Sequence, residues 1–358
     1  MPKLLWLFKY PSKIDKFSQK IIRETLGGTR PISGQNVMKA LHVYALDLII
    51  KTLAEIGVLK YVEKMPRTKE DIENHCGIRR DDVFGDILEV LTLNGVLEEA
   101  GGRFRLKREL VKKPKFLQDL KKEPSISGMF EVLSVLGSSL ADVLLSGTAL
   151  FDWEKDAALA WEALEVSYPF TLARLFTIEH AFKYIAIRRK TKVRLGIVGT
   201  SCGWAIANAY SYFRIRKKPV EIVGLEFSER AYKLSQELIH ERDIPSYVLH
   251  SEIPEKLFEE EKDFDIIICF HHEYLFTFEE RRRIINSLKF KLKEDGALLL
   301  FSFTRYKHLI PAWDIIFKTI RNWKGLPDVE EHRSILRTLF MRVKEKSGGK
   351  LVKAEYPL

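Results

Sequence analysis

The sequence has few cysteines and few glutamines. Its three cysteines, Cys76, Cys202 and Cys269, lie far apart and form no CxxC pair. This spacing excludes a disulfide framework and a zinc knuckle, and it favours a reducing, cytoplasmic location. Only four glutamines stand among many lysines, arginines and glutamates, which is a composition typical of thermophiles. The histidines lack the spacing of metal ligands on one helix face, so we predict no metal site.

Long apolar runs are also missing. The apolar patch at residues 4–8 lies between lysines and is too short for the core of a secretory signal. The longest apolar stretch, residues 129–151, is broken by Glu131, Asp142, two glycines and several serines. We therefore predict neither a secretory signal nor a membrane span.

Positive charge is abundant but unevenly spread. The chain has 358 residues, enough for two domains, and a net charge of +10. Residues 1–30 hold seven Lys/Arg against two acids, and residues 101–122 hold nine against two, so the remainder is slightly acidic. Such basic clusters attract nucleic acid or anionic lipid. The alternative is the solvated surface of a thermophile protein.

The N-terminal part of the chain suggests an arm followed by a small helical domain. Within the basic arm, residues 1–35, apolar side chains recur at helical spacing. Such an arm packs on a partner subunit, on a membrane surface, or on its own domain. Residues 36–108 read as three helices, at 37–56, after Thr68 and at 81–93, followed by a hairpin with a glycine turn. This order predicts a winged helix. Asp82, Asp86 and Glu89 on its third helix argue against reading of DNA bases, while the basic hairpin mildly favours phosphate contact.

The rest of the chain predicts a helical region and then an α/β domain. Residues 109–190 read as helices that wall off or cover a substrate pocket, among them 126–145, 157–164 and 170–187. From residue 191 to residue 358, strands are predicted at 193–199, 220–226, 246–251, 264–270, 296–303, 340–344 and 350–356. Helices are predicted at 204–215, 228–242, 276–293, 310–322 and 330–339. The fold class is thus α/β, a Rossmann-like, doubly wound, mostly parallel seven-stranded sheet with an antiparallel edge, preceded by an all-α/winged-helix domain.

The most informative stretch is residues 193–226. An apolar β run leads into the small-residue turn Gly199-Thr-Ser-Cys-Gly203, then a helix, then a second β run that ends on Glu226. A tight loop of this kind lets backbone N–H groups approach a ligand, and an acid at the end of the next strand accepts hydrogen bonds from ribose hydroxyls. The loop is GxSxG and has no lysine for phosphates. The pattern predicts a site for a nucleotide-like group.

Several segments carry a family resemblance. LGIVGTSCG matches a glycine-rich first motif, GLEFSERAYKLSQ a second strand with a ribose-binding acid, and YVLHSEIPEKL an adenine-contacting turn. FDIIICFHHEYLF, LKEDGALLLFSF and EEHRSILRTL match the later strands and the terminal helix. Over about residues 36–358 the chain resembles the class I S-adenosylmethionine-dependent methyltransferases. It looks most like the O-methyltransferases with an N-terminal winged-helix dimerisation domain.

The resemblance implies S-adenosylmethionine as cofactor and a homodimer formed through the N-terminal domain. It assigns cofactor binding to residues at the ends of the first four strands of the sheet: Gly199, Thr200, Ser201, Gly203, Glu226, Phe227, Ser251, Glu252 and Phe270. The sequence departs from the family pattern in three places. Ile197 stands where an acid that anchors the amino-acid end of the cofactor is usual, and Ser201 stands where the middle glycine is usual. Ser251, with Glu252 beside it, replaces the acid of the third-strand turn.

The candidate catalytic residues are His272 and His271. The resembled enzymes take their general base from a His-Asp-Trp run, and His272-Glu273-Tyr274 is the closest counterpart here, with a looser spacing. An imidazole near neutral pKa can take the proton of a hydroxyl or ammonium as that group attacks the sulfonium methyl. A histidine that only lines or caps the turn is the alternative. Cys269 and Cys202 are explained by packing.

Three functions remain open from the sequence. The first is a methyltransferase that acts on an oxygen or nitrogen of a small molecule. The second is an RNA or DNA methyltransferase that uses the basic arm and wing, although the Cys-Phe-His-His end of the fourth strand differs from base-modifying enzymes. The third is a non-catalytic regulator that retains the fold, motivated by Ile197 and Ser201. Nucleic acid is thus a less favoured partner than a small-molecule acceptor, and contact of the arm with a membrane surface stays open.

Overall fold

The computed structural model describes most of the chain, and its contacts divide it into two compact units. The described residues are 16–25, 34–107, 117–157, 164–188, 191–251, 258, 260–270, 272–305, 310–346 and 351–357. The first unit holds the described residues of 36–157 and 305–325, and the second those of 9–35, 158–304 and 326–358. The expected segments 109–190 and 191–358 are therefore each divided between the two units. The roles assigned to the four expected segments stay predictions.

A seven-stranded sheet forms the centre of the second unit. Its order is β6-β5-β4-β7-β8-β10-β9, with parallel pairing from β6 to β8 and antiparallel pairing of β10 with β8 and β9. The strands are β4 (Val193–Val198), β5 (Val220–Glu226), β6 (Ser246–His250), β7 (Phe264–Phe270), β8 (Leu292–Phe301), β9 (Phe340–Lys346) and β10 (Leu351–Pro357). The predicted doubly wound sheet with an antiparallel edge is confirmed. Its order reverses between β4 and β7, and ligands bind at such a point in open α/β sheets.

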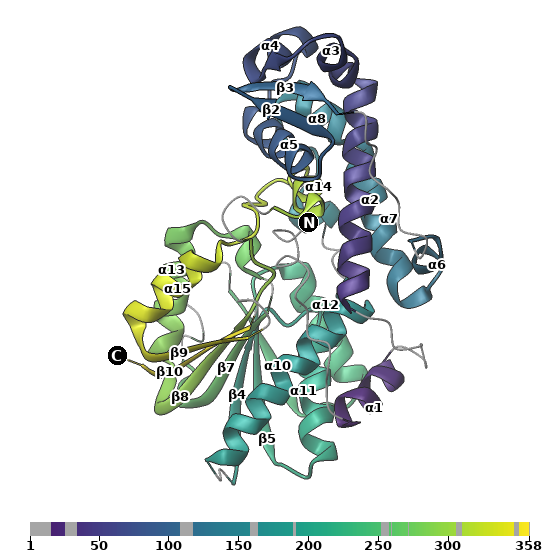
Figure 1. Ribbon diagram of the computed structural model, residues 1–358. Coiled ribbons are helices and arrows are strands. Elements are labelled where there is room, and N and C mark those ends of the chain that lie inside the picture. The colour runs from purple at the N-terminus through teal and green to yellow at the C-terminus, as the bar shows by residue number, and fades with distance from the viewer. Residues whose placement is uncertain are drawn as a thin grey trace. The chain divides into compact units, whose positions relative to one another are not determined.

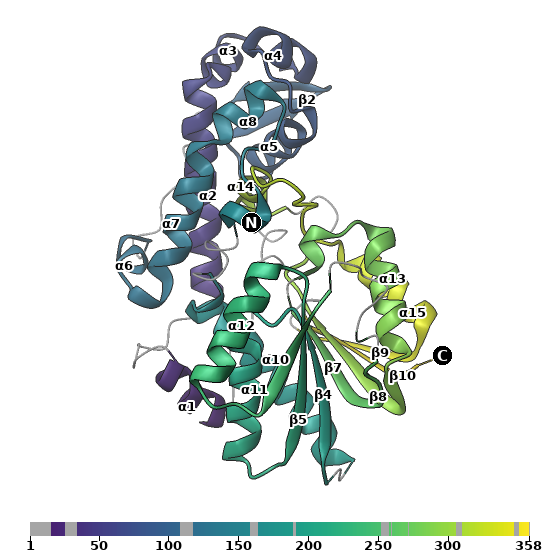
Figure 2. The same ribbon diagram turned by 180° about the vertical axis from the view of Figure 1, so that it is seen from behind.

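Helices cover both faces of this sheet (Figures 1 and 2). One face carries α10 (Tyr168–Ile187), α11 (Trp204–Ile215) and α12 (Glu229–Glu241), and the other carries α13 (Phe278–Lys289) and α15 (Val329–Leu339). Every residue of β7 is buried, because a strand covered on both faces needs no polar side. Capping boxes at Thr277 and Asp328 begin α13 and α15.

The amphipathic helix of the arm lies within the second unit. Helix α1 (Lys16–Thr25) packs against α10 and α11, and it buries Ile21 and Ile22 there while Lys16 and Lys20 stay exposed. Packing on its own domain, one of the three expected roles, thus accounts for the apolar face of these residues. Contact of the arm with a partner or a membrane stays a prediction.

The first unit is mainly helical. Its elements are α2 (Gly34–Glu55), α3 (Val58–Lys64), β1 (Arg67–Thr68), α4 (Lys69–Cys76), α5 (Asp81–Leu93), β2 (Leu97–Ala100), β3 (Arg103–Leu106), α6 (Leu117–Lys121), α7 (Pro124–Ser138), α8 (Leu140–Ser146), the π turn η2 (Trp153–Ala157) and α14 (Ala312–Phe317). The three predicted helices and the hairpin are confirmed. The hairpin gains β1 as a third strand, in the order β1-β3-β2. The winged-helix assignment stays a prediction.

Helices α7 and α8 replace the single helix predicted at 126–145, with Ser139 between them. Together, Pro124–Ser146 are long and apolar enough to cross a membrane by length and composition, with a mean hydropathy of 1.5. Half of that window is buried inside the protein, however, as in the core helices of globular domains. A single such segment is weak evidence for a membrane span.

Candidate functional site

The loop between β4 and α11 has an unusual backbone. Its φ angle is positive at Gly199 (73°), Ser201 (55°), Cys202 (53°) and Gly203 (88°). The left-handed conformation costs a residue with a Cβ about 1–2 kcal/mol. Strained residues of this kind concentrate at ligand sites, where the surrounding structure holds them in place. The loop thus has the backbone strain expected of a binding loop.

Two glycines let this loop pack closely against its neighbours. A Cβ on Gly203 would lie 3.1 Å from the Cα of Ser235 in α12. A Cβ on Gly224, in β5, would lie 2.8 Å from the methyl carbon of Thr200 and 2.7 Å from Ile206. Neither backbone approach leaves room for a side chain. Gly203 and Gly224 therefore allow the loop to pack closely against β5 and α12.

Glu226 is held directly by the loop. The backbone N–H and the hydroxyl of Thr200 both donate to its Oε2, at 2.9 Å each, and the N–H of Phe227 donates to its Oε1 at 3.0 Å. Burial raises the pKa of Glu226, while the hydrogen bonds from Thr200, Phe227 and Ser228 act in the opposite direction. The residue keeps 8% of its surface exposed. The acid and the loop predicted from sequence thus form one hydrogen-bonded unit.

The other predicted cofactor residues fall at the same edge of the sheet. The N–H of Ser251, just after β6, donates to the carbonyl of Glu226 at 3.1 Å. Phe270 ends β7, one residue beyond the Cys269–Val198 pair, and is buried. Glu252 lies outside the described residues. The described members of the predicted set therefore gather at the carboxyl ends of β4, β5, β6 and β7.

The position of the missing acid is fully apolar. Ile197 is completely buried, and in the sheet it pairs with Gly224 on one side and Ile268 on the other. It is a core residue, and residues 193–203 contain no Asp or Glu. The end of β4 and its loop therefore offer no carboxylate to a ligand.

The turn that follows β7 is anchored at two points. It is the 3-10 turn η4 (His272–Leu275). Glu273 and His332 of α15 are both buried, with 3.2 Å between Oε2 and Nε2. The hydroxyl of Tyr274 accepts the N–H of Phe303, just beyond β8, at 2.8 Å. Burial raises the pKa of Tyr274 well above its ordinary value.

The structure describes the turn next to the two candidate bases but not their side chains. His271 lies outside the described residues, as does the side chain of His272. The backbone of His272 opens η4, so the turn lies at the carboxyl edge of the sheet, as predicted. Sequence reasoning gave no role to Ser235 in α12 or to His332 in α15, although both lie in the quoted segments, because the sequence does not show which side chains of a helix reach the site.

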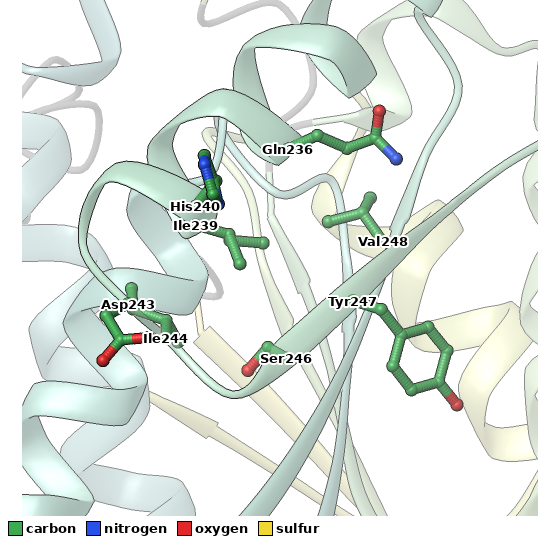
Figure 3. A pocket seen from close by; sticks show the side chains of 8 residues that line it. All are labelled: Gln236, Ile239, His240, Asp243, Ile244, Ser246, Tyr247 and Val248. Carbon is green, nitrogen blue, oxygen red and sulfur yellow. The ribbon is translucent and has the colours of Figure 1, made fainter.

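A cavity of ≈ 330 Å³ lies elsewhere in the second unit (Figure 3). It lies between the last turns of α12 and the start of β6, whereas the predicted site lies where the strands end. Its lining residues are Gln236, Ile239, His240, Asp243, Ile244, Ser246, Tyr247 and Val248. None of these belongs to the predicted cofactor or catalytic set. Within the described residues, no group of three or more His, Cys, Asp or Glu side chains is arranged to hold a metal ion.

Comparison with known proteins places the fold. No protein-family model and no curated protein matches the sequence. The CMeT domain of the citrinin polyketide synthase is similar with a TM-score of 0.68 and 14% identity, over 96% of each chain. The CurJ carbon methyltransferase gives a TM-score of 0.64 and 15% identity, over 96% of this chain and 99% of that one. An O-methyltransferase family 2 protein from Planctomyces limnophilus, solved in complex with apigenin, gives 0.51 and 13% identity, over 92% of this chain and 98% of that one. The chain therefore has the fold of these methyltransferases, as the sequence predicted.

Proposed function

We propose that the protein is an S-adenosylmethionine-dependent methyltransferase that acts on a small molecule. The observation that carries this proposal is the bonded unit of Thr200 and Glu226 at the carboxyl edge of the sheet, in a fold shared with solved methyltransferases. A carboxylate in this place, next to a strained small-residue loop, suits the ribose of a nucleoside.

The residues present fit the nucleoside end of the cofactor. Glu226 accepts hydrogen bonds from the ribose, the loop from Gly199 to Gly203 supports it, and Phe227, Ser251 and Phe270 line the adenosine. Glu252, outside the described residues, is proposed for the same role from the sequence alone. Ile197 offers nothing to the methionine end. When bound, the cofactor supplies an electrophilic methyl group on a sulfonium sulfur.

His272, with His271 as the neighbouring alternative, is the proposed general base. An imidazole at this turn takes a proton from the acceptor as the acceptor attacks the methyl group. An open α/β sheet binds ligands where η4 lies, at the carboxyl ends of its strands. The protein's own contribution is thus to orient the acceptor and to remove its proton.

The acceptor atom has two candidates. The sequence favours an oxygen or a nitrogen, in keeping with the O-methyltransferase among the similar structures. An acidic carbon is the second candidate, because CurJ, which has a higher TM-score, is named as a carbon methyltransferase. A cell extract incubated with the protein and ¹³C-methyl cofactor separates the two, because the carbon chemical shift of the product methyl identifies its bonded atom.

Calorimetry with S-adenosylmethionine tests the proposal. We expect binding by the wild type and a loss of about tenfold or more in Glu226→Gln, because the carboxylate bonds to ribose are charge-assisted. Glu221→Gln is the matched control, since Glu221 lies at the other end of β5 and pairs with Arg194 and Lys192. Absence of binding by the wild type, or equal binding by Glu226→Gln, would contradict the proposed function.

Two further points are proposals of assembly and location. We infer a homodimer formed through residues 36–108 and a cytoplasmic location. The molar mass of the protein in solution tests the first point. It is measured for the protein alone and with an added tagged fragment, residues 36–108, that competes for the dimer interface. Nucleic-acid modification and a non-catalytic role are the less favoured functions. A gel shift with tRNA at low salt tests the former, and transfer of labelled methyl into extract tests the latter.

A further inference from the structure

Three oxygen atoms form a chain behind Glu226. The hydroxyl oxygen of Thr200 lies 2.9 Å from Glu226 Oε2 and 2.7 Å from the hydroxyl oxygen of Ser235. Ser235 in turn lies 2.7 Å from the carbonyl oxygen of Ala231, one helical turn earlier in α12. Thr200 and Ser235 are both completely buried. The hydroxyl of Thr200 therefore stands between two acceptors, away from solvent.

The chain contains two hydroxyl protons, and two of their arrangements place a proton in the short contact between Thr200 and Ser235. In the closed arrangement, Ser235 donates to Thr200 and Thr200 donates to Glu226. In the open arrangement, Thr200 donates to Ser235 and Ser235 donates to Ala231. Each hydroxyl has one proton and two lone pairs, so every proton is used in both arrangements. Only hydrogen atoms move between them.

The carboxylate of Glu226 has an acceptor position for a ligand only when the hydroxyl proton of Thr200 points to Ser235. Oε2 accepts the N–H and the hydroxyl of Thr200, and Oε1 accepts the N–H of Phe227, with the amide of Ser228 also acting on the carboxylate. Two carboxylate oxygens offer about four acceptor positions. The amide donors are fixed by the backbone. The hydroxyl proton of Thr200 is the donor that can turn away without moving a heavy atom.

Packing keeps the oxygen of Thr200 in place while its proton turns. The methyl carbon of Thr200 lies so close to Gly224 that a Cβ there would be 2.8 Å away. The side chain thus has a fixed rotamer, and its hydroxyl stays within reach of both acceptors. This arrangement suits a switch that works by proton direction alone.

We propose that Thr200 and Ser235 form a hydrogen-bond switch that opens Glu226 to the hydroxyl groups of a ribose. A ribose hydroxyl donates to Oε2, and the Thr200 hydroxyl turns to Ser235. The switch favours ligands with a ribose hydroxyl over deoxy analogues, because only a donor replaces the proton that Thr200 withdraws. This inference rests on the proposed function and names a positioning pair for its cofactor.

The test compares two substitutions with opposite expected signs. Ser235→Ala removes the alternative acceptor, so Thr200 stays on Glu226 and the affinity for S-adenosylhomocysteine falls about tenfold. Thr200→Val removes the competing donor, so the affinity rises by up to about tenfold. Ser235→Thr keeps the hydroxyl and restores wild-type binding. All variants are measured by calorimetry at one pH, because burial raises the pKa of Glu226.

Each result of these binding measurements either supports or overturns the switch. A purely structural role would weaken binding in Thr200→Val and Ser235→Ala alike, and that parallel loss overturns the switch. Binding by Ser235→Ala within about twofold of wild type also overturns it. If Thr200→Val does not fold, the affinities of the two Ser235 variants for adenosine and for 2′,3′-dideoxyadenosine are compared instead. The switch requires their affinity ratio to shrink in Ser235→Ala relative to Ser235→Thr, and an equal ratio overturns it. Failure of the proposed function gives a different result, because neither the wild type nor any variant then binds these nucleosides.

Discussion

Arg174 offers a demanding test of how the second unit is held together. Its side chain is completely buried in α10. It donates to the Glu165 carboxylate at 2.5 Å, to the Glu165 carbonyl at 2.6 Å, to Thr171 at 3.0 Å and to Asn208 at 3.3 Å. Asn208 lies in α11, the helix that follows the glycine loop. The guanidinium thus joins α10 to the helix that supports the candidate site.

The expected magnitude follows from the burial of both charges. Arg174→Met leaves the Glu165 carboxylate, 1% exposed, without its cation, and removal of one partner of a buried pair costs about 3–5 kcal/mol. The double variant Arg174→Met with Glu165→Leu removes both charges. Because desolvation largely offsets the attraction within such a pair, the double variant recovers most of the lost stability.

Urea unfolding followed by far-ultraviolet circular dichroism measures these free energies. Lys233→Met is the matched control, because its partner Glu229 forms an exposed pair at 2.8 Å. Its unfolding midpoint should equal that of the wild type. A loss below about 1 kcal/mol in Arg174→Met, or a double variant less stable than the single one, would refute the reasoning.

Three further predictions concern other sites. Burial lowers the pKa of His42, which accepts the Ala312 N–H at 3.0 Å, so the folded state binds fewer protons than the unfolded one. Stability of the first unit should therefore fall as pH drops below the ordinary histidine value of about 6.5, and His42→Gln should flatten this dependence in urea titrations. Gly203→Ala should cost about 2 kcal/mol, because φ is 88° and Ser235 leaves no space, and thermal unfolding with a stability gain would contradict this. Glu273→Met with His332→Leu should keep the unfolding midpoint but speed amide exchange in η4, and exchange equal to wild type would show that the pair does not order the turn.

The local elements could be read from the sequence wherever they follow one period. Helix α5 and strand β7 have the predicted bounds, because each has a clear apolar pattern and clear ends. Helix α3 was missed, since its seven residues follow α2 after a short turn at Gly57. The single helix predicted at 126–145 is wrong at Ser139, because the apolar periodicity continues across the break.

Only the part of the candidate site that is formed by the glycine loop and Glu226 could be predicted from the sequence. The glycine loop and Glu226 are linked by strand–loop–helix–strand order, so their meeting follows from the topology of a parallel sheet. The contact of Thr200 with Ser235 spans 35 residues and depends on how α12 lies over the loop. His332 reaches Glu273 from α15 in the same manner. Neither pairing leaves a periodic or compositional trace in the sequence.

Ile197 leads to a last prediction, about where the binding energy of the proposed cofactor lies. Because the β4 end and its loop contain no acid, and Ile197 is a core residue, the methionine end of the cofactor finds no carboxylate there. The Glu226 unit at the ribose end is complete by contrast. We therefore expect S-adenosylhomocysteine and 5′-methylthioadenosine, which lacks the amino-acid group, to bind with dissociation constants within about threefold of each other. Competition calorimetry measures this ratio. A preference of about a hundredfold for S-adenosylhomocysteine would show that another element holds the amino-acid end, since a charged hydrogen bond is worth about 1.5–3 kcal/mol.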